Sequence, residues 1–280
     1  LGFFASGFAW ISNAFFVDSE TYAVLALPAV GGLAAGFALY TGIVGVVFRF
    51  FPSASDDAML QARVIHHACR ITFFAVLWSL VEWWRGWFLT GFPWNPIGSA
   101  WVNLPYFLQG AAVIGVYGLS LVTILAATSL GLLTQGHPKR IAWLLVGVCH
   151  MPLLCFALAG AVRLSGATDG VVDGVVLRIV QPNIAQADKW RPALREQHLL
   201  DQVVMSTDNA NAVTHVLWPE TAAPFALNRA PRATSALSVA VPVGGVVLTG
   251  APRVLVSGKE RQSFNSLFAI SGDGQIIASY

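Results

Sequence analysis

Charged residues are scarce in this chain of 280 residues, since Asp, Glu, Lys and Arg make up only 11% of it, against about 25% in soluble domains. The net charge of +2 is too small to predict a surface for nucleic acid, which is therefore not an expected partner. Cysteine is also rare. Cys69, Cys149 and Cys155 all fall in apolar stretches, so no disulfide framework can be read. His66 and His67 stand without ligand partners at metal spacing, so they are interpreted as interfacial residues and no metal site is expected.

Apolar side chains are what the sequence has in excess. Hydrophobic residues make up 56% of the chain, which predicts a membrane protein. The charges are uneven, because residues 1–165 hold 12 of the 30 while the shorter stretch 166–280 holds 18. We therefore predict two domains, a polytopic transmembrane helical bundle over 1–165 and a water-soluble domain over 166–280.

Five apolar stretches are interpreted as membrane spans, each of which needs about 20 helical residues. They cover residues 1–17, 22–51, 64–84, 105–133 and 141–162. The first is short for a span, the chain begins at Leu1 without a methionine, and it stops at Tyr280 inside an apolar, strand-like run. We therefore expect these residues to be a fragment whose second domain is incomplete at its C-terminal end.

The positions of Lys and Arg predict how the bundle is oriented, because short cytoplasmic loops are rich in these residues. The connection between the second and third spans, with its flanks, carries Arg49, Arg63 and Arg70, and the next connection on that side carries Lys139 and Arg140. Both connections are therefore predicted to be cytoplasmic. Alternation of the spans then places residues 166–280 on the extracytoplasmic side.

The connection between the third and fourth spans is rich in tryptophan, reading EWWRGWFLTGFPWNP over 82–96. Two interpretations are open. One is an aromatic belt at the membrane interface, with Glu82 and Arg85 as a pair one helical turn apart. The other is a folded loop that faces the soluble domain and its substrate, since glycine and proline at 86, 91, 93 and 96 favour a folded loop.

Strand and helix patterns alternate in residues 166–280, which predicts a mixed α/β layer fold. Strands are predicted over 175–180, 215–218 and 245–250, and Pro192 is predicted to open a helix that extends to about residue 209. Residues 265–270 and 275–280 are predicted to form an antiparallel hairpin whose turn is 271–274.

Glu220 is the main candidate for chemistry. Residues 216–218 have the pattern of a buried strand, and Pro219 cannot donate to a strand ladder, so the chain leaves the sheet there. Glu220 is thereby predicted at the C-terminal edge of a strand, where open α/β folds bind ligands. Flanked by Trp218, Pro219 and Phe225, the carboxylate is expected to be partly desolvated, which favours proton uptake and suits a general base. The alternative is a solvated acid in a turn.

Six pieces of sequence carry a resemblance to a known family. They are WRGWFLTGFPW over 84–94, VQPNI over 180–184, KW at 189–190, WPET over 218–221, LTG over 248–250 and FNS over 264–266. In composition and order they resemble the apolipoprotein N-acyltransferase family, a membrane-anchored branch of the nitrilase (carbon-nitrogen hydrolase) superfamily. The resemblance covers essentially the whole chain. It implies that residues 166–280 form the first part of a nitrilase-like αββα sandwich.

The resemblance also implies roles for individual residues. Glu220 is the general base that takes a thiol proton, Trp190 lies near the acyl substrate, and Asn265 supports the pocket. Two alternatives are open, namely Trp190 as an anchor between domain and membrane and Asn265 as a polar turn residue. The resemblance places the family's catalytic Lys and nucleophilic Cys beyond Tyr280. Lys189 and Lys259 lie in the wrong segments to replace that Lys, and residues 166–280 hold no cysteine. We therefore expect no acyl transfer by this chain alone.

The activity that the resemblance implies is acyl transfer in two steps. A fatty acyl chain passes from a phospholipid to an enzyme thioester, and then to the N-terminal amine of the diacylglyceryl-cysteine of an apolipoprotein, without a cofactor. The implied location is the bacterial inner membrane, with the catalytic domain facing the periplasm. A membrane-tethered amidase and a non-catalytic lipid-binding relative are the alternatives. The scarcity of charges inside the spans argues against a transporter.

Overall fold

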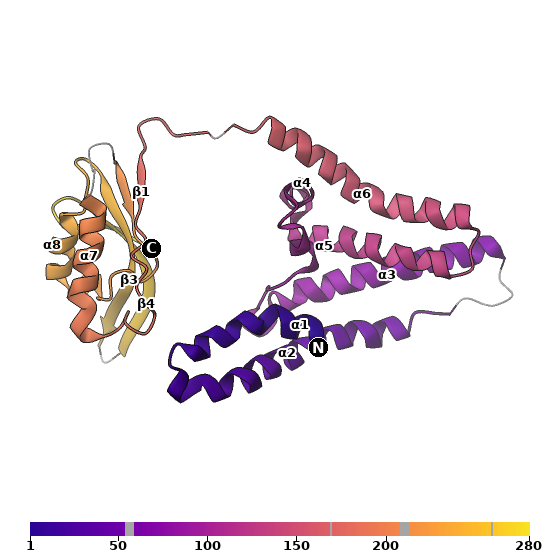
Figure 1. Cartoon of the computed structure of the whole chain (residues 1–280), viewed down its shortest axis with the longest axis horizontal. Coiled ribbons are helices and arrows are strands. Elements are labelled where there is room, and N and C mark those ends of the chain that lie inside the picture. The colour runs from indigo at the N-terminus through magenta and orange to yellow at the C-terminus, as the bar shows by residue number, and fades with distance from the viewer. Residues whose placement is uncertain (54–58, 169, 208–212, 259) are drawn as a thin grey trace. The chain divides into compact units, whose positions relative to one another are not determined.

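The computed structural model describes residues 1–53, 59–168, 170–207, 213–258 and 260–280. The chain divides into two compact units, Leu1–Thr168 and Asp169–Tyr280. The first unit is helical, and the second contains a sheet with helices packed on it (Figure 1).

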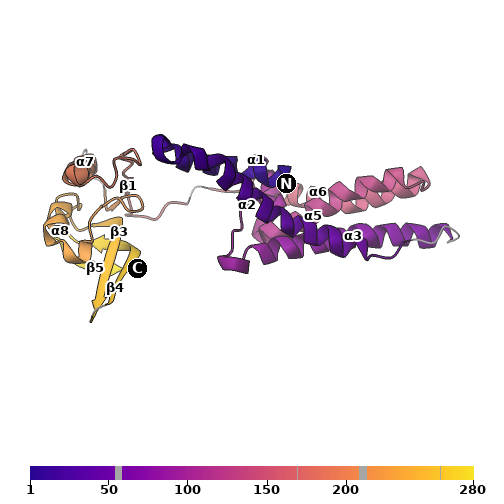
Figure 2. The ribbon, with the colours of Figure 1, turned by 90° about the horizontal axis from the view of Figure 1, so that it is seen from below.

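Four helices of the first unit are long and apolar enough to cross a membrane, counting only the described residues. They are α2 (Ser19–Arg49), α3 (Leu60–Arg85), α5 (Ala111–Ser129) with a 3₁₀ continuation (Leu130–Thr134), and α6 (Lys139–Ser165). A helix suits the bilayer because it bonds its backbone N–H and C=O groups within the segment. Helix α5 packs beside both α3 and α6, as Figure 1 and Figure 2 show.

Two of the predicted spans differ from the structure. Residues 1–17 form a short helix α1 (Gly2–Phe8) followed by a 3₁₀ helix (Ala9–Phe16). This stretch is not among the four long apolar helices, so the fifth span stays a prediction. The α-helix stops at Phe8, whose buried ring packs edge-on against Phe37 with the centroids 5.0 Å apart. The span predicted over 105–133 is divided into α4 (Pro105–Leu108) and α5, and α5 is interrupted at Gly115, where φ is +68°. Glycine enters that conformation without a steric penalty.

The aromatic connection after α3 is a folded loop held by two buried charges. Arg85 and Glu82 are 3% and 5% exposed, and their closest N and O atoms are 4.0 Å apart. Each makes a shorter bond to the loop backbone: Arg85 Nη1 donates to the carbonyl of Trp94 at 2.6 Å, and the Ile97 N–H donates to Glu82 Oε1 at 2.9 Å. The loop contains two 3₁₀ helices, Phe88–Thr90 and Ile97–Trp101. The interpretation as a folded loop is confirmed, whereas its facing the soluble domain stays a prediction.

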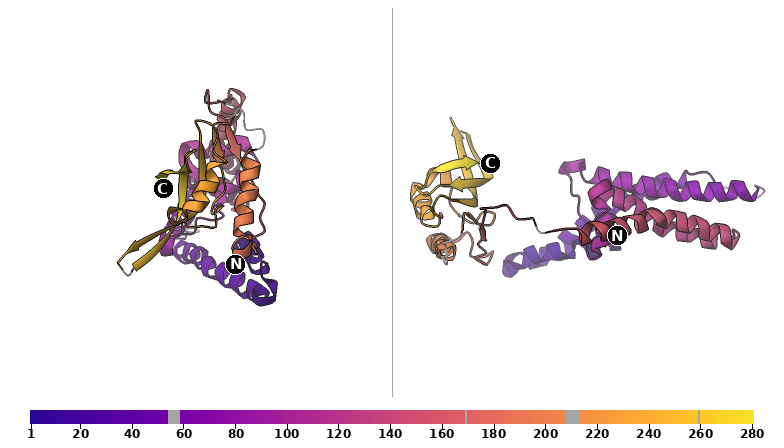
Figure 3. Two further views of the ribbon diagram at one scale, coloured as in Figure 1. Left: turned by 90° about the vertical axis from the view of Figure 1, so that its left-hand side faces the viewer. Right: turned by 90° about the horizontal axis from the view of Figure 1, so that it is seen from above.

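The described part of the second unit contains a five-stranded mixed sheet whose strands lie in chain order. They are β1 (Leu177–Ile179), β2 (His215–Leu217), β3 (Val246–Ser257), β4 (Glu260–Ile270) and β5 (Ile276–Ser279). Strands β1 to β3 are parallel, and β3 to β5 are antiparallel. The five predicted strands are confirmed, but β3 and β4 have 12 and 11 residues instead of six each. The extra residues, 251–257 and 260–264, form a hairpin arm that Figure 3 (left) shows extending from the sheet. Strand β4 contributes mostly polar side chains to this arm, and β3 contributes Val254, Leu255 and Val256.

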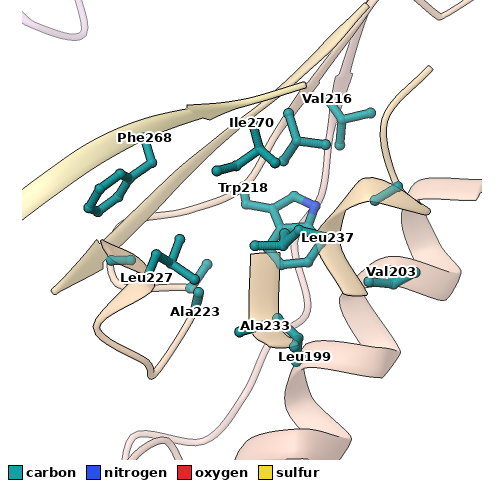
Figure 4. Packing of buried hydrophobic residues seen from close by; sticks show 14 of the residues in the cluster. Leu199, Val203, Val216, Trp218, Ala223, Leu227, Ala233, Leu237, Phe268 and Ile270 are labelled. Carbon is teal, nitrogen blue, oxygen red and sulfur yellow. The ribbon is translucent and has the colours of Figure 1, made fainter. Parts of the chain in front are cut away.

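Helices α7 (Arg195–Thr207) and α8 (Pro231–Ser238) form one layer on one face of the sheet. Figure 4 shows the core between these layers, which includes Leu199, Val203, Val216, Trp218, Leu237, Phe268 and Ile270. The helix predicted from Pro192 is confirmed through a 3₁₀ turn (Pro192–Leu194) and α7, while its predicted end at residue 209 lies outside the described residues. The sequence pattern predicts neither α8 nor the 3₁₀ turn before it (Leu227–Arg229), because segments this short show no helical period.

The backbones of β3 and of the turn after β2 meet at Gly250. The Gly250 N–H donates to the Pro219 carbonyl at 3.3 Å, and the Ala223 N–H donates to the Gly250 carbonyl at 3.3 Å. A Cβ atom on Gly250 would lie 2.6 Å from the Thr221 nitrogen and 2.8 Å from Glu220 Cα, closer than real Cβ atoms come. This contact fixes the turn that carries Glu220, and it requires glycine.

Substitution of Gly250→Ala is expected to displace the turn over 219–221 and to destabilise the second unit by about 1–3 kcal/mol, the usual cost of overpacking. The matched control is Gly272→Ala, whose Cβ would meet Val241 Cγ1 at 4.0 Å, an ordinary contact. Hydrogen exchange with mass spectrometry is the measurement. Peptides from 217–224 should exchange faster in Gly250→Ala and at the normal rate in Gly272→Ala, and equal protection in both variants would contradict this role for the contact.

Candidate active site

Glu220 lies where the chain leaves the sheet, beyond the carboxyl end of β2. The Trp218 N–H donates to the Leu248 carbonyl at 2.8 Å, and Pro219 has no N–H with which β2 could continue the ladder. Thr221 then adopts a φ of +51°, which completes a tight turn around Glu220. The carboxylate therefore lies at the edge of the sheet that the sequence predicts.

The side chain of Glu220 is exposed, so the prediction that it is partly desolvated is wrong. The two aromatic residues expected to cover it face the core instead. Trp218 is only 5% exposed and donates from Nε1 to the Ser206 hydroxyl of α7 at 2.8 Å, and Phe225 packs against the same core. The carboxylate is therefore oriented by a hydrogen bond rather than by burial.

Asn265 holds the Glu220 carboxylate from β4, two strands along the sheet. Its Nδ2 donates to Glu220 Oε1 at 2.5 Å. Asn265 is an internal residue of β4, paired with Pro252, so the alternative in which it is a turn residue is wrong. Among the residues that the structure describes, no other side chain or N–H donates to this carboxylate. Its second oxygen, Oε2, is therefore available to take a proton.

A cavity of about 320 Å³ opens beside Glu220. Its lining combines an aromatic and aliphatic surface with a few polar groups, from Trp218, Glu220, Gly250, Asn265, Ser266, Leu267 and Tyr280. That combination is typical of small-molecule sites, in which polar groups orient a largely apolar ligand. A proton acceptor therefore stands next to a surface that suits an apolar substrate.

Lys189 also reaches the Glu220 turn, a contact that no sequence pattern predicts. Its Nζ donates to the backbone carbonyl of Glu220 at 3.2 Å. That Lys189 lies in the wrong segment to replace the family's catalytic Lys stays a prediction. Trp190 follows directly, is 45% exposed, and is not part of the cavity lining described above. Both roles suggested for Trp190 therefore stay predictions.

Helix α7 ties the segment over 188–190 to the turn that carries Glu220. His198 Nε2 donates to the backbone carbonyl of Asp188 at 3.2 Å. Gln202 is fully buried and donates from Nε2 to the Ala222 carbonyl at 3.0 Å. One helix face therefore positions the two segments that approach the cavity.

The chemistry available at this site is proton transfer and hydrogen bonding. The described residues contain no group of three or more His, Cys, Asp or Glu side chains that could hold a metal ion. Residues 169–280 contain no cysteine. The site therefore offers a base and hydrogen-bond donors, but no thiol from these residues.

Comparisons with known proteins match both units of the chain. The model of the apolipoprotein N-acyltransferase N-terminal domain matches residues 1–129. A curated relative from Rhodopseudomonas palustris, named apolipoprotein N-acyltransferase, is 32% identical over 100% of this chain and 52% of its own length. Relatives of the same name from Brucella melitensis and Allorhizobium ampelinum are 36% and 34% identical, over 99% of this chain and 51% of their own length.

The chain thus spans about half the length of the curated relatives it matches. The family model covers the helices from α1 to α5, and the matches to the relatives continue through α6 and the sheet. Together with the four candidate spans, the bacterial relatives make this a bacterial membrane protein. By these matches, the chain belongs to the apolipoprotein N-acyltransferase family.

Proposed function

We propose that Glu220 is the general base of an acyl transfer to apolipoproteins. The observation that carries the proposal is the geometry of its carboxylate, which Asn265 binds on one oxygen while the other is open beside a cavity with an apolar wall. The family of the chain supplies the reaction class, N-acylation of lipoproteins. The proposed donor is a phospholipid, and the proposed acceptor is a diacylated apolipoprotein.

The proposed first step forms a thioester. Glu220 takes the proton of a cysteine thiol, which the family resemblance places beyond Tyr280, and the thiolate attacks an ester carbonyl of the phospholipid. A Lys, also placed beyond Tyr280 by the resemblance, stabilises the oxyanion. When the ester C–O bond breaks, the proton on Glu220 passes to the leaving alkoxide, and a lysophospholipid departs.

The proposed second step transfers the acyl chain to nitrogen. The α-amine of the diacylglyceryl-cysteine attacks the thioester, gives a proton to Glu220, and forms an amide as the C–S bond breaks. The proton on Glu220 then returns to the thiolate. The sequence involves no change of oxidation state, so it needs no redox cofactor. Trp190 is proposed to contact the acyl substrate, and Asn265 to orient the Glu220 carboxylate.

A base is needed because a free thiol has a pKa of about 8.5 and is only a few per cent thiolate at pH 7. A positioned base typically contributes about 10²- to 10⁴-fold in rate. Glu220 fits this role better than a purely structural one, since its only described partner leaves Oε2 open.

A chimera in which residues 1–280 replace the matching half of the Brucella melitensis relative tests the proposal. The unsubstituted chimera is expected to move a fatty acyl chain from phospholipid to a diacylated lipopeptide. Glu220→Gln keeps the shape of the side chain but removes its basicity, so acyl-enzyme formation should fall by about 10²- to 10⁴-fold. Intact-protein mass spectrometry after incubation with phospholipid measures the acyl mass that the enzyme gains.

The matched control is Glu196→Gln, an exposed acid on α7 outside the cavity, which should leave acylation unchanged. Normal acylation by a folded Glu220→Gln chimera would contradict the role of Glu220. An unsubstituted chimera that folds but is inactive would contradict the proposed acyltransferase activity of residues 1–280. Release of free fatty acid without a lipopeptide product would show that water is the acceptor and would also overturn the proposal.

We also propose that the protein resides in the inner membrane with its nitrilase-like domain, residues 166–280, facing the periplasm. The support is the distribution of charge at the helix ends. Arg49 ends α2 and Lys139 begins α6, whereas the start of α2 carries acids, with Asp18 at the N-cap and Glu20 in the first turn. Positive residues at short cytoplasmic connections favour this orientation.

Thiol labelling tests the orientation, in a background whose three native cysteines are replaced by Ala. Cysteines introduced as Ser53→Cys and Thr134→Cys should react with a membrane-impermeant maleimide only after the inner membrane is broken. Ser235→Cys should react as soon as the outer membrane is permeabilised. All three positions are exposed, so access rather than burial decides the result. The reverse labelling pattern would contradict the proposed orientation.

A further inference from the structure

A second cavity of about 320 Å³ lies in the first unit, between α2, α3 and the end of α5. It shares no residue with the cavity beside Glu220. Most of its wall is apolar, and its lining includes Phe48, His67, Arg70, Phe74, Gly131 and Leu132. None of its lining residues is acidic. The cavity therefore combines an apolar wall with a positive charge.

Arg70 supplies that charge, and no carboxylate neutralises it in the described ranges of the chain. Its guanidinium carbon lies 5.1 Å from the centroid of the Phe48 ring, and the side chain is exposed. The described residues accept no hydrogen bond from Arg70 and form no ion pair with it. A guanidinium has five N–H donors in a planar fork that matches phosphate. Arg70 can therefore bind an oxyanion without giving up a protein partner.

His67 adds a fixed polar group to the same wall. Its Nδ1 lies 2.8 Å from Nε2 of His137, which is only 9% exposed. One ring donates to the other, because each neutral imidazole has one N–H and one acceptor nitrogen. In the tautomer in which His137 donates, His67 carries its proton on Nε2 and adds a donor to that of Arg70. In that tautomer, the histidine pair favours an acceptor-rich ligand.

The position of Arg70 along α3 corresponds to the headgroup level of a membrane. The ten residues before it include Arg63, His66 and His67, whereas residues 71–81 carry no charge. Arginine side chains at such a boundary extend toward the interface while their stems contact apolar surface. A membrane boundary at Arg70 would set the cavity at the level of the lipid phosphates, with its apolar wall extending toward the acyl chains.

We propose that this cavity binds an anionic phospholipid, whose phosphate contacts Arg70 and whose acyl chain lies along Phe74 and Leu132. Guanidinium and phosphate form charge-assisted, bidentate hydrogen bonds. A zwitterionic headgroup fits less well, because its own cation competes with Arg70 for the phosphate. Basic pockets between spanning helices are a recurring form of lipid recognition. The site is separate from the Glu220 cavity and does not depend on the acyl-transfer proposal.

Native mass spectrometry of the 280-residue chain in detergent micelles tests this site, with phosphatidylglycerol as the probe. The chain is expected to retain phosphatidylglycerol in preference to phosphatidylcholine. Arg70→Gln should weaken the binding by about tenfold or more, the equivalent of one lost charge-assisted hydrogen bond. Arg49→Gln is the matched control, since it removes the same charge next to Phe48 from an exposed residue outside the lining, and it should have no effect.

A second pair of variants tests occupancy without changing charge. Gly131→Leu should fill the cavity and weaken binding to a similar degree, whereas Gly147→Leu on α6 should not. A Cβ atom at either glycine meets no atom within 4 Å, so both variants are expected to fold. If circular dichroism shows that Arg70→Gln does not fold, the comparison of Gly131→Leu with Gly147→Leu decides whether the cavity binds the lipid.

Three results would overturn the proposal. Equal losses in Arg70→Gln and Arg49→Gln would show attraction to the general surface charge. Unchanged binding in Gly131→Leu would place the lipid outside the cavity. Inorganic phosphate bound as tightly as phosphatidylglycerol would assign the site to a free anion rather than to a lipid.

Discussion

The contact of the Gly250 backbone with the turn over 219–221 is the constraint on which the candidate site depends. Strand β3 can lie this close to the end of β2 because residue 250 has no side chain. The turn leaves the ladder at Pro219 and passes through a left-handed φ at Thr221, so Glu220 emerges at the edge of the sheet. Asn265 then binds the carboxylate from β4. The contact at Gly250 therefore packs β3 against the turn and, at the same time, places the proposed base.

In the first unit, Glu82 and Arg85 fix the backbone of a loop, as Gly250 does in the second unit. Buried charges are costly unless their hydrogen-bonding groups are satisfied, and Arg85 Nη1 and Glu82 Oε1 bond to the backbone of the connection after α3. Glu82 Oε2 has no hydrogen-bond partner among the described residues. The Arg85 guanidinium also lies over the rings of Phe4 and Phe37, at 5.5 and 5.7 Å from their centroids. The loop and the buried pair therefore stabilise each other, and part of the aromatic content surrounds a cation instead of lying in lipid.

Local patterns predict the elements whose shape depends on near neighbours. Proline after an apolar run predicts where β2 ends, and amphipathic spacing predicts α7. The remaining features of the site depend on contacts between residues that are distant in the sequence. Lys189 is 31 residues from Glu220 and Asn265 is 45 residues from it, and no spacing rule indicates either pair. Only the family resemblance points to Asn265. The local pattern also fails to predict that Glu220 is exposed, because the direction of the Trp218 side chain depends on a distant contact with Ser206 of α7.

A double-mutant cycle on acyl-enzyme formation by the chimera, with Glu220→Gln and Asn265→Ala, measures whether Glu220 acts as the base and whether Asn265 acts through it. If both are so, Asn265→Ala slows acylation when Glu220 is present and has little further effect once Glu220→Gln has been made. Independent losses that multiply in the double variant would contradict this coupling.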